Sequence, residues 1–286
     1  SHIYRIVRDG QVRVNGGRSR PSTRISSGDK VRIPPLRLSN SANSSGENRD
    51  PSFQPNFLFE DRDLLIIDKP SGIAVHGGTG QHVSVIEQLR LTTSGFLELV
   101  HRLDKETSGI LMLAKNMEAL RQMHTRLRQV DSQSGIKKSY QALLAGRWQG
   151  EQRTLSQRLE TVRGRSGEKR SRVTSNGREA RSVFTPLELL KDYSLMHVEL
   201  MTGRLHQIRA HAHAAGLPVA GDKIYGARDQ NRHLRKFGLR RQFLHASRIR
   251  FCHPRTGKTV DVQSPVPDDL MSVLANLRLR SDNESI

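Results

Sequence analysis

Cysteine, aromatic residues and long apolar runs are all scarce in this chain of 286 residues. Cys252 is the single cysteine, which excludes an internal disulfide and a zinc site built from several thiolates. Aromatic residues make up 5%, so a surface that stacks many single-stranded bases is not supported. No apolar stretch has the length that spans a bilayer, and no signal-peptide pattern is present. These absences are consistent with a location in a reducing cytoplasm.

Acidic residues are few relative to basic ones. The chain has 47 Lys and Arg against 28 Asp and Glu, a net charge of +19, and its pI is near 11.0. Such a charge attracts polyanions, because binding releases the counterions of a phosphate backbone. The composition therefore favours a nucleic-acid partner, the alternative being a solvated surface that is merely cationic. The length suits one large catalytic domain and a small additional module.

The first 38 residues have the pattern of a compact basic module. Residues 4–8 look like the end of a helix that Asp9-Gly10 stops, so we expect native residues to precede Ser1. Residues 11–16 and 25–35 each have the pattern of a strand with a turn. Nine basic residues against two acids give a net charge of +7 here, and the alternative is a small basic unit that does not bind RNA. The arginines that we expect to contact RNA are Arg5, Arg8, Arg13 and Arg18.

Residues 39–52 are rich in Ser and Asn and predict a flexible linker, and residues 53–286 predict one globular catalytic domain. We expect its strands, several of them in hairpins, at 64–69, 96–100, 110–114, 140–145, 183–190, 194–200, 243–251 and 259–262. We expect its helices at 116–129, 205–215 and 268–279. Because hairpins outnumber strand–helix–strand crossovers, the predicted fold is α+β, with a largely antiparallel central sheet flanked by helices.

A polar loop lies between two apolar runs at His101–Gly109. Four of its first six residues are charged at pH 7 when histidine is counted as neutral, and loops anchored between buried strands carry a disproportionate share of active sites. The alternative is a structural, salt-bridged turn. The loop is therefore the first candidate for the chemistry of this protein.

A second polar cluster begins at Thr202. Gly203 allows a tight turn and Thr202 is a plausible N-cap, which would place Arg204 at a helix start that favours anions. Three histidines follow, of which only His206 and His213 would share a helix face. Since no adjacent carboxylate completes a ligand set, we predict no metal site.

Several segments together resemble the RluA-type pseudouridine synthases. The polar loop and the strand after it resemble that family's active-site motif. The other matching segments are 65–76, 138–143, 202–211, 221–226 and 243–246. Residues 1–35 resemble an S4-type RNA-binding module that lacks its first helix. The resemblance thus covers nearly the whole chain.

The resemblance assigns roles to individual residues. It implies that Asp104 is the catalytic aspartate, that Tyr140 stacks on the base, and that Arg204 pairs with the aspartate. Arg102 matches the position whose side chain fills the gap left by a flipped base. Leu205 departs from the pattern, since many members carry Thr or Ser there.

The resemblance also implies a reaction and a partner. The expected activity is isomerisation of uridine to pseudouridine in large-subunit ribosomal RNA, in a bacterial cytoplasm, by a monomer. Nothing is oxidised and no phosphate is transferred, so we expect no cofactor and no metal. Asp104 could act as a nucleophile or as a base, and both remain open. The alternative functions are a non-catalytic RNA-binding or ribosome-assembly protein and a nucleoside glycosylase.

Residues 147–181 form a second basic stretch. Ten basic residues against four glutamates give a net charge of +6, and the Gly and Ser content predicts an extended loop or irregular hairpin that clamps RNA phosphates. The alternative is a solvated charged face. The arginines that we expect to contact RNA outside the first module are Arg163, Arg165, Arg170 and Arg209.

Overall fold

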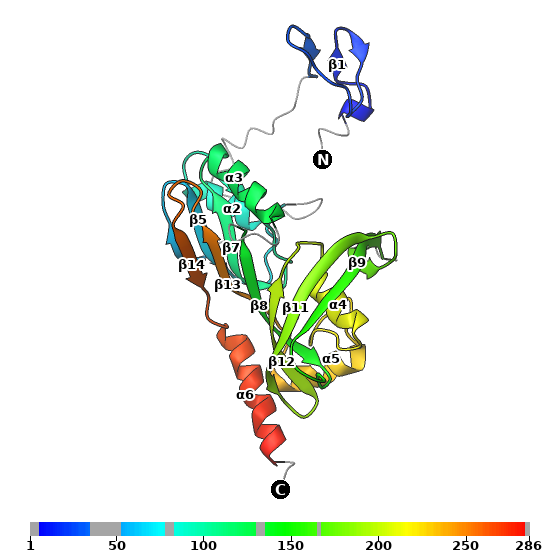
Figure 1. Ribbon diagram of the computed structural model, residues 1–286, viewed down its shortest axis with the longest axis vertical. Coiled ribbons are helices and arrows are strands. Elements are labelled where there is room, and N and C mark those ends of the chain that lie inside the picture. The colour runs from blue at the N-terminus through cyan, green and yellow to red at the C-terminus, as the bar shows by residue number, and fades with distance from the viewer. Residues whose placement is uncertain (1–5, 35–52, 78–82, 130–134, 165–166, 284–286) are drawn as a thin grey trace. The chain divides into compact units, whose positions relative to one another are not determined.

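The computed structural model divides the chain into two compact units, Ser1–Asn48 and Arg49–Ile286 (Figure 1). The residues whose structure is described are 6–34, 53–77, 83–129, 135–164 and 167–283. The predicted linker at 39–52 lies outside them, so its boundaries remain a prediction.

The first unit contains a small antiparallel sheet. Its strands, in the order β2-β1-β3, are β1 (Arg13–Val14), β2 (Gly17–Arg18) and β3 (Val31–Arg32). Asn15 (φ 49°) and Gly16 (φ 79°) connect β1 to β2, as expected of a two-residue hairpin turn that requires positive φ at both positions. Residues 6–8 are helical and end at Gly10 (φ 72°), which agrees with the helix end predicted from the sequence.

The second unit is built on one sheet of eleven strands (Figure 1). Along its main path the strand order is β10-β9-β11-β12-β8-β13-β7-β5-β4, while β14 pairs with β13 and β6 with β7. The strands are β4 (Asn56–Glu60), β5 (Leu64–Lys69), β6 (Glu98–Leu99), β7 (Ser108–Ala114), β8 (Lys137–Ala145), β9 (Arg153–Arg163), β10 (Lys169–Val173), β11 (Arg178–Leu189), β12 (Tyr193–Leu200), β13 (Leu244–Cys252) and β14 (Thr259–Gln263). Within the described residues only β7 and β13 pair in parallel.

Short helices pack beside this sheet. They are α2 (Val85–Thr92), α3 (Met117–Arg128), α4 (Gln207–Ala214), α5 (Arg228–Leu234), the 3-10 helix η1 (Arg235–Phe237) and α6 (Asp268–Asn283). Ser84 caps α2 and Asn116 caps α3, each accepting a backbone N–H of the first turn. In Figure 1, α2 and α3 lie by the β5–β7 half of the sheet, and α4 and α5 by the β9–β12 half. The predicted α+β class with a mostly antiparallel sheet is confirmed.

The two largest apolar clusters hold most of these layers together. The larger includes Leu64–Ile67 of β5, Ile110–Ala114 of β7 and residues of α2 and α3, all buried. The smaller joins Leu143 and Phe243 to the apolar face of α6. The continuous apolar runs of β5 and β7 are explained by this burial, because both faces of these strands are covered. No helix among the described residues is both long and apolar enough to cross a membrane.

The basic stretch at 147–181 is more regular than predicted. Its described residues form β9, β10 and the start of β11, paired antiparallel in continuous register. Of the two predicted forms, the extended loop was wrong, whereas a hairpin is present and is regular rather than irregular. Exposed positions of these strands carry arginine, which masks the buried alternation at Leu155, Leu159 and Ala180. The hairpins β11–β12 and β13–β14 are confirmed.

Candidate active site

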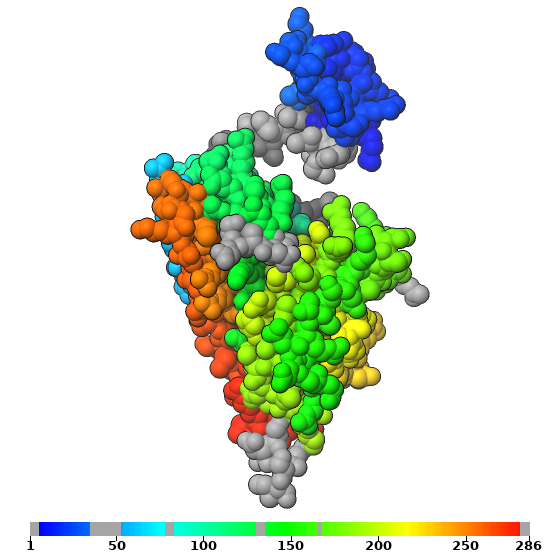
Figure 2. All heavy atoms as spheres, viewed as in Figure 1, coloured from blue at the N-terminus to red at the C-terminus, as the bar shows by residue number. Residues whose placement is uncertain are grey.

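A cleft of about 1050 Å³ gathers the candidate residues of the second unit. The Asp104 loop and the residues after it, α3, β8 and the segment before α4 supply its walls. The surface is hollowed between α3 and the hairpin of β9 and β10 (Figure 2). Asp104, Tyr140, Arg102 and Arg204, all predicted from the sequence, line this cleft. Three segments far apart in the chain therefore meet in one place.

The loop that carries Asp104 is held in place by a buried lysine. Lys69 at the end of β5 is 0% exposed. Its Nζ donates to the carbonyls of Pro70 (2.7 Å), Ile73 (3.0 Å) and Lys105 (3.1 Å). Burial is the largest cause that lowers the pKa of Lys69 to about 7. These three bonds tie the loop to the turn after β5.

The other side of the loop is held by two further donors and a close strand approach. The carbonyl of Glu106 accepts from Ser71 Oγ (2.9 Å) and from Arg241 Nη1 (3.3 Å). Gly109 (φ 104°) follows, and a Cβ there would lie 2.3 Å from the carbonyl oxygen of Ala246. Only glycine fits at this position, where β7 meets β13. The loop is therefore a rigid support for Asp104.

The Asp104 carboxylate is held by Arg209. Arg209 Nη1 donates to Asp104 Oδ2 at 2.7 Å. The same guanidinium donates from Nε (2.6 Å) and Nη2 (2.9 Å) to the two oxygens of Asp222. The side chain of Arg209 is 6% exposed, that of Asp222 0% and that of Asp104 23%. Asp104 is thus the member of this group that faces the cleft.

The buried pair of Arg209 and Asp222 stays charged. Burial alone would lower the pKa of Arg209, but the hydrogen bonds and charges of Asp222 and Asp104 outweigh it and raise that pKa. Burial alone would raise the pKa of Asp222, yet the bonds from Arg209 and from the backbone N–H groups of Ile224 and Tyr225 lower it. Asp222 therefore anchors the guanidinium, which in turn orients the Asp104 carboxylate.

The predicted partner of Asp104 was wrong. Arg204 lines the cleft, but its Nε donates to the carbonyl of Glu179 (2.9 Å), whereas Arg209 makes the ion pair with Asp104. The cause is a shift of the helix start. Gln207 Oε1 accepts from the Arg204 N–H (3.0 Å), and His206 takes a left-handed conformation (φ 49°). Helix α4 therefore begins at Gln207, and Arg204 lies in the turn before it.

Tyr140 and Arg102 line the same cleft as Asp104. Tyr140 on β8 is 6% exposed. Burial, with the charge of Asp104 as a second cause, raises its pKa, so the phenol stays protonated at neutral pH. The side chain of Arg102 is exposed in the cleft and has no hydrogen bond or ion pair with the part of the chain that the structure describes. It is therefore free to move toward a ligand.

Three residues without a role in the sequence analysis complete the site. They are Asp222, His206 and Tyr225. His206 Nε2 lies 3.8 Å from Asp104 Oδ2, and burial is the main cause that lowers its pKa. The ring of Tyr225 lies under the Arg209 guanidinium, 5.2 Å from its central carbon. Nothing in the local pattern connects these positions to Asp104, because the connection is made only by the folded sheet.

The hydroxyl of Tyr225 also links the site to the basic hairpin. It accepts from the backbone N–H of Ser171 on β10 (2.7 Å) and donates to the carbonyl of the same residue (3.0 Å). His206 Nδ1 lies 3.3 Å from the same hydroxyl oxygen. One ring thus contacts the Asp104 partner and the strand that carries exposed arginines.

The arginines expected to contact RNA lie in different surroundings. Those that are exposed are Arg8, Arg13, Arg18, Arg163 and Arg170. Arg5 and Arg165 lie outside the described residues. Arg209 is buried and bound to two carboxylates, so the expectation that it meets RNA phosphates was wrong.

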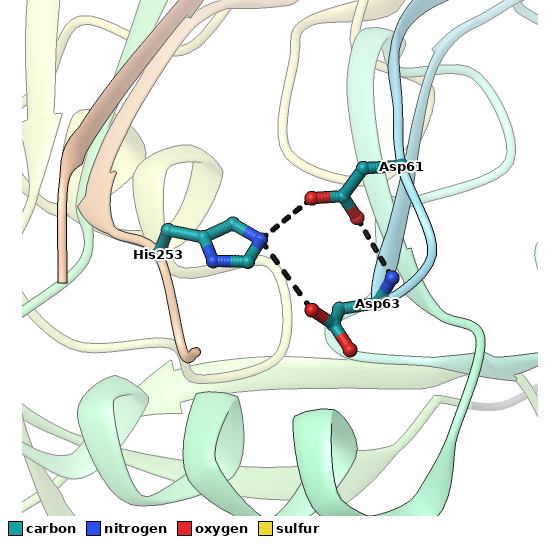
Figure 3. A group of neighbouring side chains, drawn as sticks. All are labelled: Asp61, Asp63 and His253. Atoms are coloured by element: carbon teal, nitrogen blue, oxygen red, sulfur yellow. Dashed lines mark hydrogen bonds and ion pairs between the residues drawn. The ribbon is translucent and has the colours of Figure 1, made fainter. Parts of the chain in front are cut away.

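One group of described residues has the composition of a metal site (Figure 3). His253 Nε2 lies 2.7 Å from Asp61 Oδ2 and 3.9 Å from Asp63 Oδ2. A metal-bound histidine normally donates a hydrogen bond from its other ring nitrogen. Here Nδ1 accepts from the backbone N–H groups of Arg255 (3.3 Å) and Thr256 (3.2 Å), and Asp63 is bound by Arg255 (2.6 Å). These hydrogen bonds fit a structural histidine–aspartate contact between strand ends better than a metal site.

Curated relatives match this chain over almost its full length. A protein of Haemophilus influenzae named ribosomal large subunit pseudouridine synthase C is 42% identical over 283 residues, covering 97% of this chain and 87% of the relative. The protein of the same name from Escherichia coli K12 is 41% identical over 288 residues, covering 97% and 88%.

Solved structures and a family profile agree with these relatives. Human RNA pseudouridylate synthase domain containing 1 superposes with a TM-score of 0.60 at 25% identity, covering 82% of this chain and 96% of that one. The related human domain containing 4 has a TM-score of 0.63 at 22% identity, covering 78% and 93%, and supports the fold. The profile described as RNA pseudouridylate synthase matches residues 63–214, which include Asp104, Tyr140 and Arg209. The chain therefore belongs to the RNA pseudouridylate synthase family of isomerases.

Proposed function

We propose that this protein isomerises specific uridines of bacterial large-subunit ribosomal RNA, with Asp104 as the catalytic carboxylate. The observation that carries the proposal is the Asp104 carboxylate itself, which faces a cleft and is held by a buried guanidinium. The names and coverage of the relatives support the substrate class. The net charge of +19 supports binding to a long polyanion.

The reaction breaks the bond between N1 of uracil and C1′ of the ribose, turns the base, and joins C5 to C1′. Both atoms are inaccessible in a stacked helix, so the nucleotide must first be extruded, at a cost of a few kcal/mol. Asp104 then attacks C1′ as a nucleophile or removes the proton of C2′ to give a glycal. In either case the carboxylate must be fixed at the sugar, and the Arg209–Asp222 pair fixes it.

Two further side chains suit this sequence of steps. Tyr140 offers a flat, protonated phenol beside Asp104, against which the detached uracil can stack while it turns. Arg102 is an exposed cation in the same cleft, so its side chain can enter the space that the extruded base leaves in the RNA. Neither step requires a cofactor.

RNA binding extends beyond the cleft. We assign residues 1–38 to a partial S4-like RNA-binding module, residues 39–52 to a linker and residues 53–286 to the catalytic domain. Exposed arginines support RNA contacts by the first module and by the β9–β10 hairpin. We place the protein in the bacterial cytoplasm, where its substrate is found, and we expect a monomer.

Pseudouridine mapping tests the proposal. Ribosomal RNA from cells with and without this protein would be compared at single-nucleotide resolution. We expect a small set of uridines in large-subunit RNA to lose the modification in the deletion strain and to regain it with the wild-type protein. Unchanged modification across the large-subunit RNA would contradict the proposed substrate.

A product analysis separates isomerisation from base removal. The purified protein would be incubated with an RNA fragment that contains a mapped uridine, and the nucleosides would be identified by mass spectrometry and chromatography. An isomerase yields a new C-nucleoside of unchanged mass, whereas a glycosylase releases free uracil. We expect the C-nucleoside and no free base.

A further inference from the structure

Lys138 is a cation in the cleft wall whose side chain has no partner among the described residues. It is half-buried on β8 and lines the cleft. Its Nζ lies 3.6 Å from the position that a Cβ on Gly203 would take, so the space beside the ammonium is left open by a glycine. Its backbone is paired in the sheet, but its ammonium has no hydrogen bond and no ion pair with the residues that the structure describes. Burial lowers its pKa to about 8. A partly desolvated cation of this kind is unfavourable until an anion meets it.

Lys138 also lies on the same face of β8 as Tyr140. It precedes Tyr140 by two residues on the same strand, so both side chains project to the same face, about 7 Å apart along the strand. The Asp104 charge acts on Tyr140, and the Lys138 charge acts on His101 at the start of the Asp104 loop. A nucleotide bound along this face of β8 could therefore meet Tyr140 with its base and Lys138 with a phosphate.

The charge of the cleft indicates the class of anion. The acidic residues that line it are Asp104 and Glu106, both on the same loop. Exposed cations line the same loop and the other walls, namely Arg102, Lys105, Arg128, Arg204 and Lys223. A wall of this charge attracts a phosphodiester chain, and a lysine binds one phosphate as a point charge.

We propose that Lys138 binds a backbone phosphate next to the flipped uridine and so sets the depth at which the ribose meets Asp104. The inference rests on the proposed function, because it requires a uridine in the cleft. It assigns the anchoring of the nucleotide to β8, with the base against Tyr140 and one flanking phosphate against Lys138.

A double-mutant cycle tests the contact between Lys138 and the phosphate. It removes the charge of the lysine, the charge of the phosphate, or both. The substrate is an RNA fragment carrying a mapped target uridine, together with copies in which one flanking phosphate at a time is a neutral methylphosphonate. Single-turnover rates would be measured over a range of enzyme concentrations. We expect K138Q to lower the second-order rate constant on the native RNA roughly 10-fold or more, the size of one charged hydrogen bond. One methylphosphonate should lower the wild-type constant by a similar factor and leave K138Q unaffected.

The neighbouring Lys137 provides a matched control. It lies on the opposite face of β8 and is exposed. K137Q should remain as sensitive to that methylphosphonate as the wild type. K138R keeps the charge, should retain most of the rate, and serves as the second variant if K138Q folds poorly.

Two results would overturn the inference alone: a K138Q enzyme that turns over at the wild-type rate, or equal sensitivity of wild type and K138Q to every methylphosphonate. In both, the wild type still forms pseudouridine. Absence of pseudouridine with the wild-type protein would instead overturn the proposed function.

Discussion

Replacement of Arg209 by Lys separates the two arginines that compete for the role of Asp104 partner. Arg209 makes three hydrogen bonds to two carboxylates from one planar group. A lysine ammonium keeps the charge but not the fork, so it cannot reach both Asp104 and Asp222 in the same geometry. Arg204 is exposed, and its guanidinium makes one hydrogen bond, to the backbone carbonyl of Glu179. R204K is therefore the matched control.

The magnitude follows from the bonds that are lost. A hydrogen bond to a charged group is worth about 1.5–3 kcal/mol, and R209K loses two of three, so we expect unfolding to become easier by roughly 3–6 kcal/mol. A surface change such as R204K should shift stability by about 0.5 kcal/mol or less. The Asp104 carboxylate also loses its orientation in R209K, and turnover should fall on the order of 10²-fold or more.

The change in unfolding free energy is measured by urea unfolding followed by circular dichroism. The change in turnover is measured by single-turnover formation of pseudouridine, under conditions where both variants are folded. The reasoning would be refuted if R204K abolished turnover while R209K had wild-type stability and rate. That outcome would restore Arg204 as the partner that the sequence motif suggested.

Three further changes probe the surroundings of the site. D222N should destabilise the protein by about 3–5 kcal/mol, because Arg209 becomes a buried cation with one carboxylate less. Since the pKa of Asp222 is lowered, this difference in unfolding free energy should persist at neutral pH and shrink only as pH falls below 3.8; a difference that vanished at pH 7 would contradict it. Y225F should cost about 1–3 kcal/mol in thermal or urea unfolding, because the β10 backbone loses its partner. Replacing Arg163, Arg165 and Arg170 by Ala should flatten the dependence of RNA affinity on salt, and an unchanged slope would remove the hairpin from the interface.

Much of the fold could be predicted because single strands and turns carry local signals. The apolar runs at 64–67 and 110–114 mark strands buried on both faces. Asn15-Gly16 marks a tight hairpin, and Asn116 marks the start of α3. Each of these features depends on residues within one element, so the sequence contains the information in one place.

The ion-pair partner of Asp104 could not be predicted in the same way. The choice between Arg204 and Arg209 depends on where α4 begins, and that start is set by the Gln207 side chain and by the left-handed His206. Asp222 reaches Arg209 only because the segment after Val219 packs against β8. These contacts join positions far apart in the chain, so the pattern of residues within one segment cannot predict them.

The basic hairpin shows a different limit. Most residues of β9 and β10 are exposed and polar or charged, and the few buried positions carry side chains no larger than leucine. Composition therefore suggested an extended loop or an irregular hairpin. Pairing across the sheet decides the structure here, since it satisfies the backbone of residues whose side chains stay in solvent.

Asp104→Asn tests the central claim most directly, because it removes one charge and almost no volume. Wild-type and D104N protein would be given the same RNA fragment in a single-turnover assay, with binding measured in parallel by filter retention. We expect D104N to bind the RNA with an affinity within a few-fold of wild type and to form no detectable pseudouridine. Formation of pseudouridine by D104N at the wild-type rate would contradict the assignment of this carboxylate as the catalytic group.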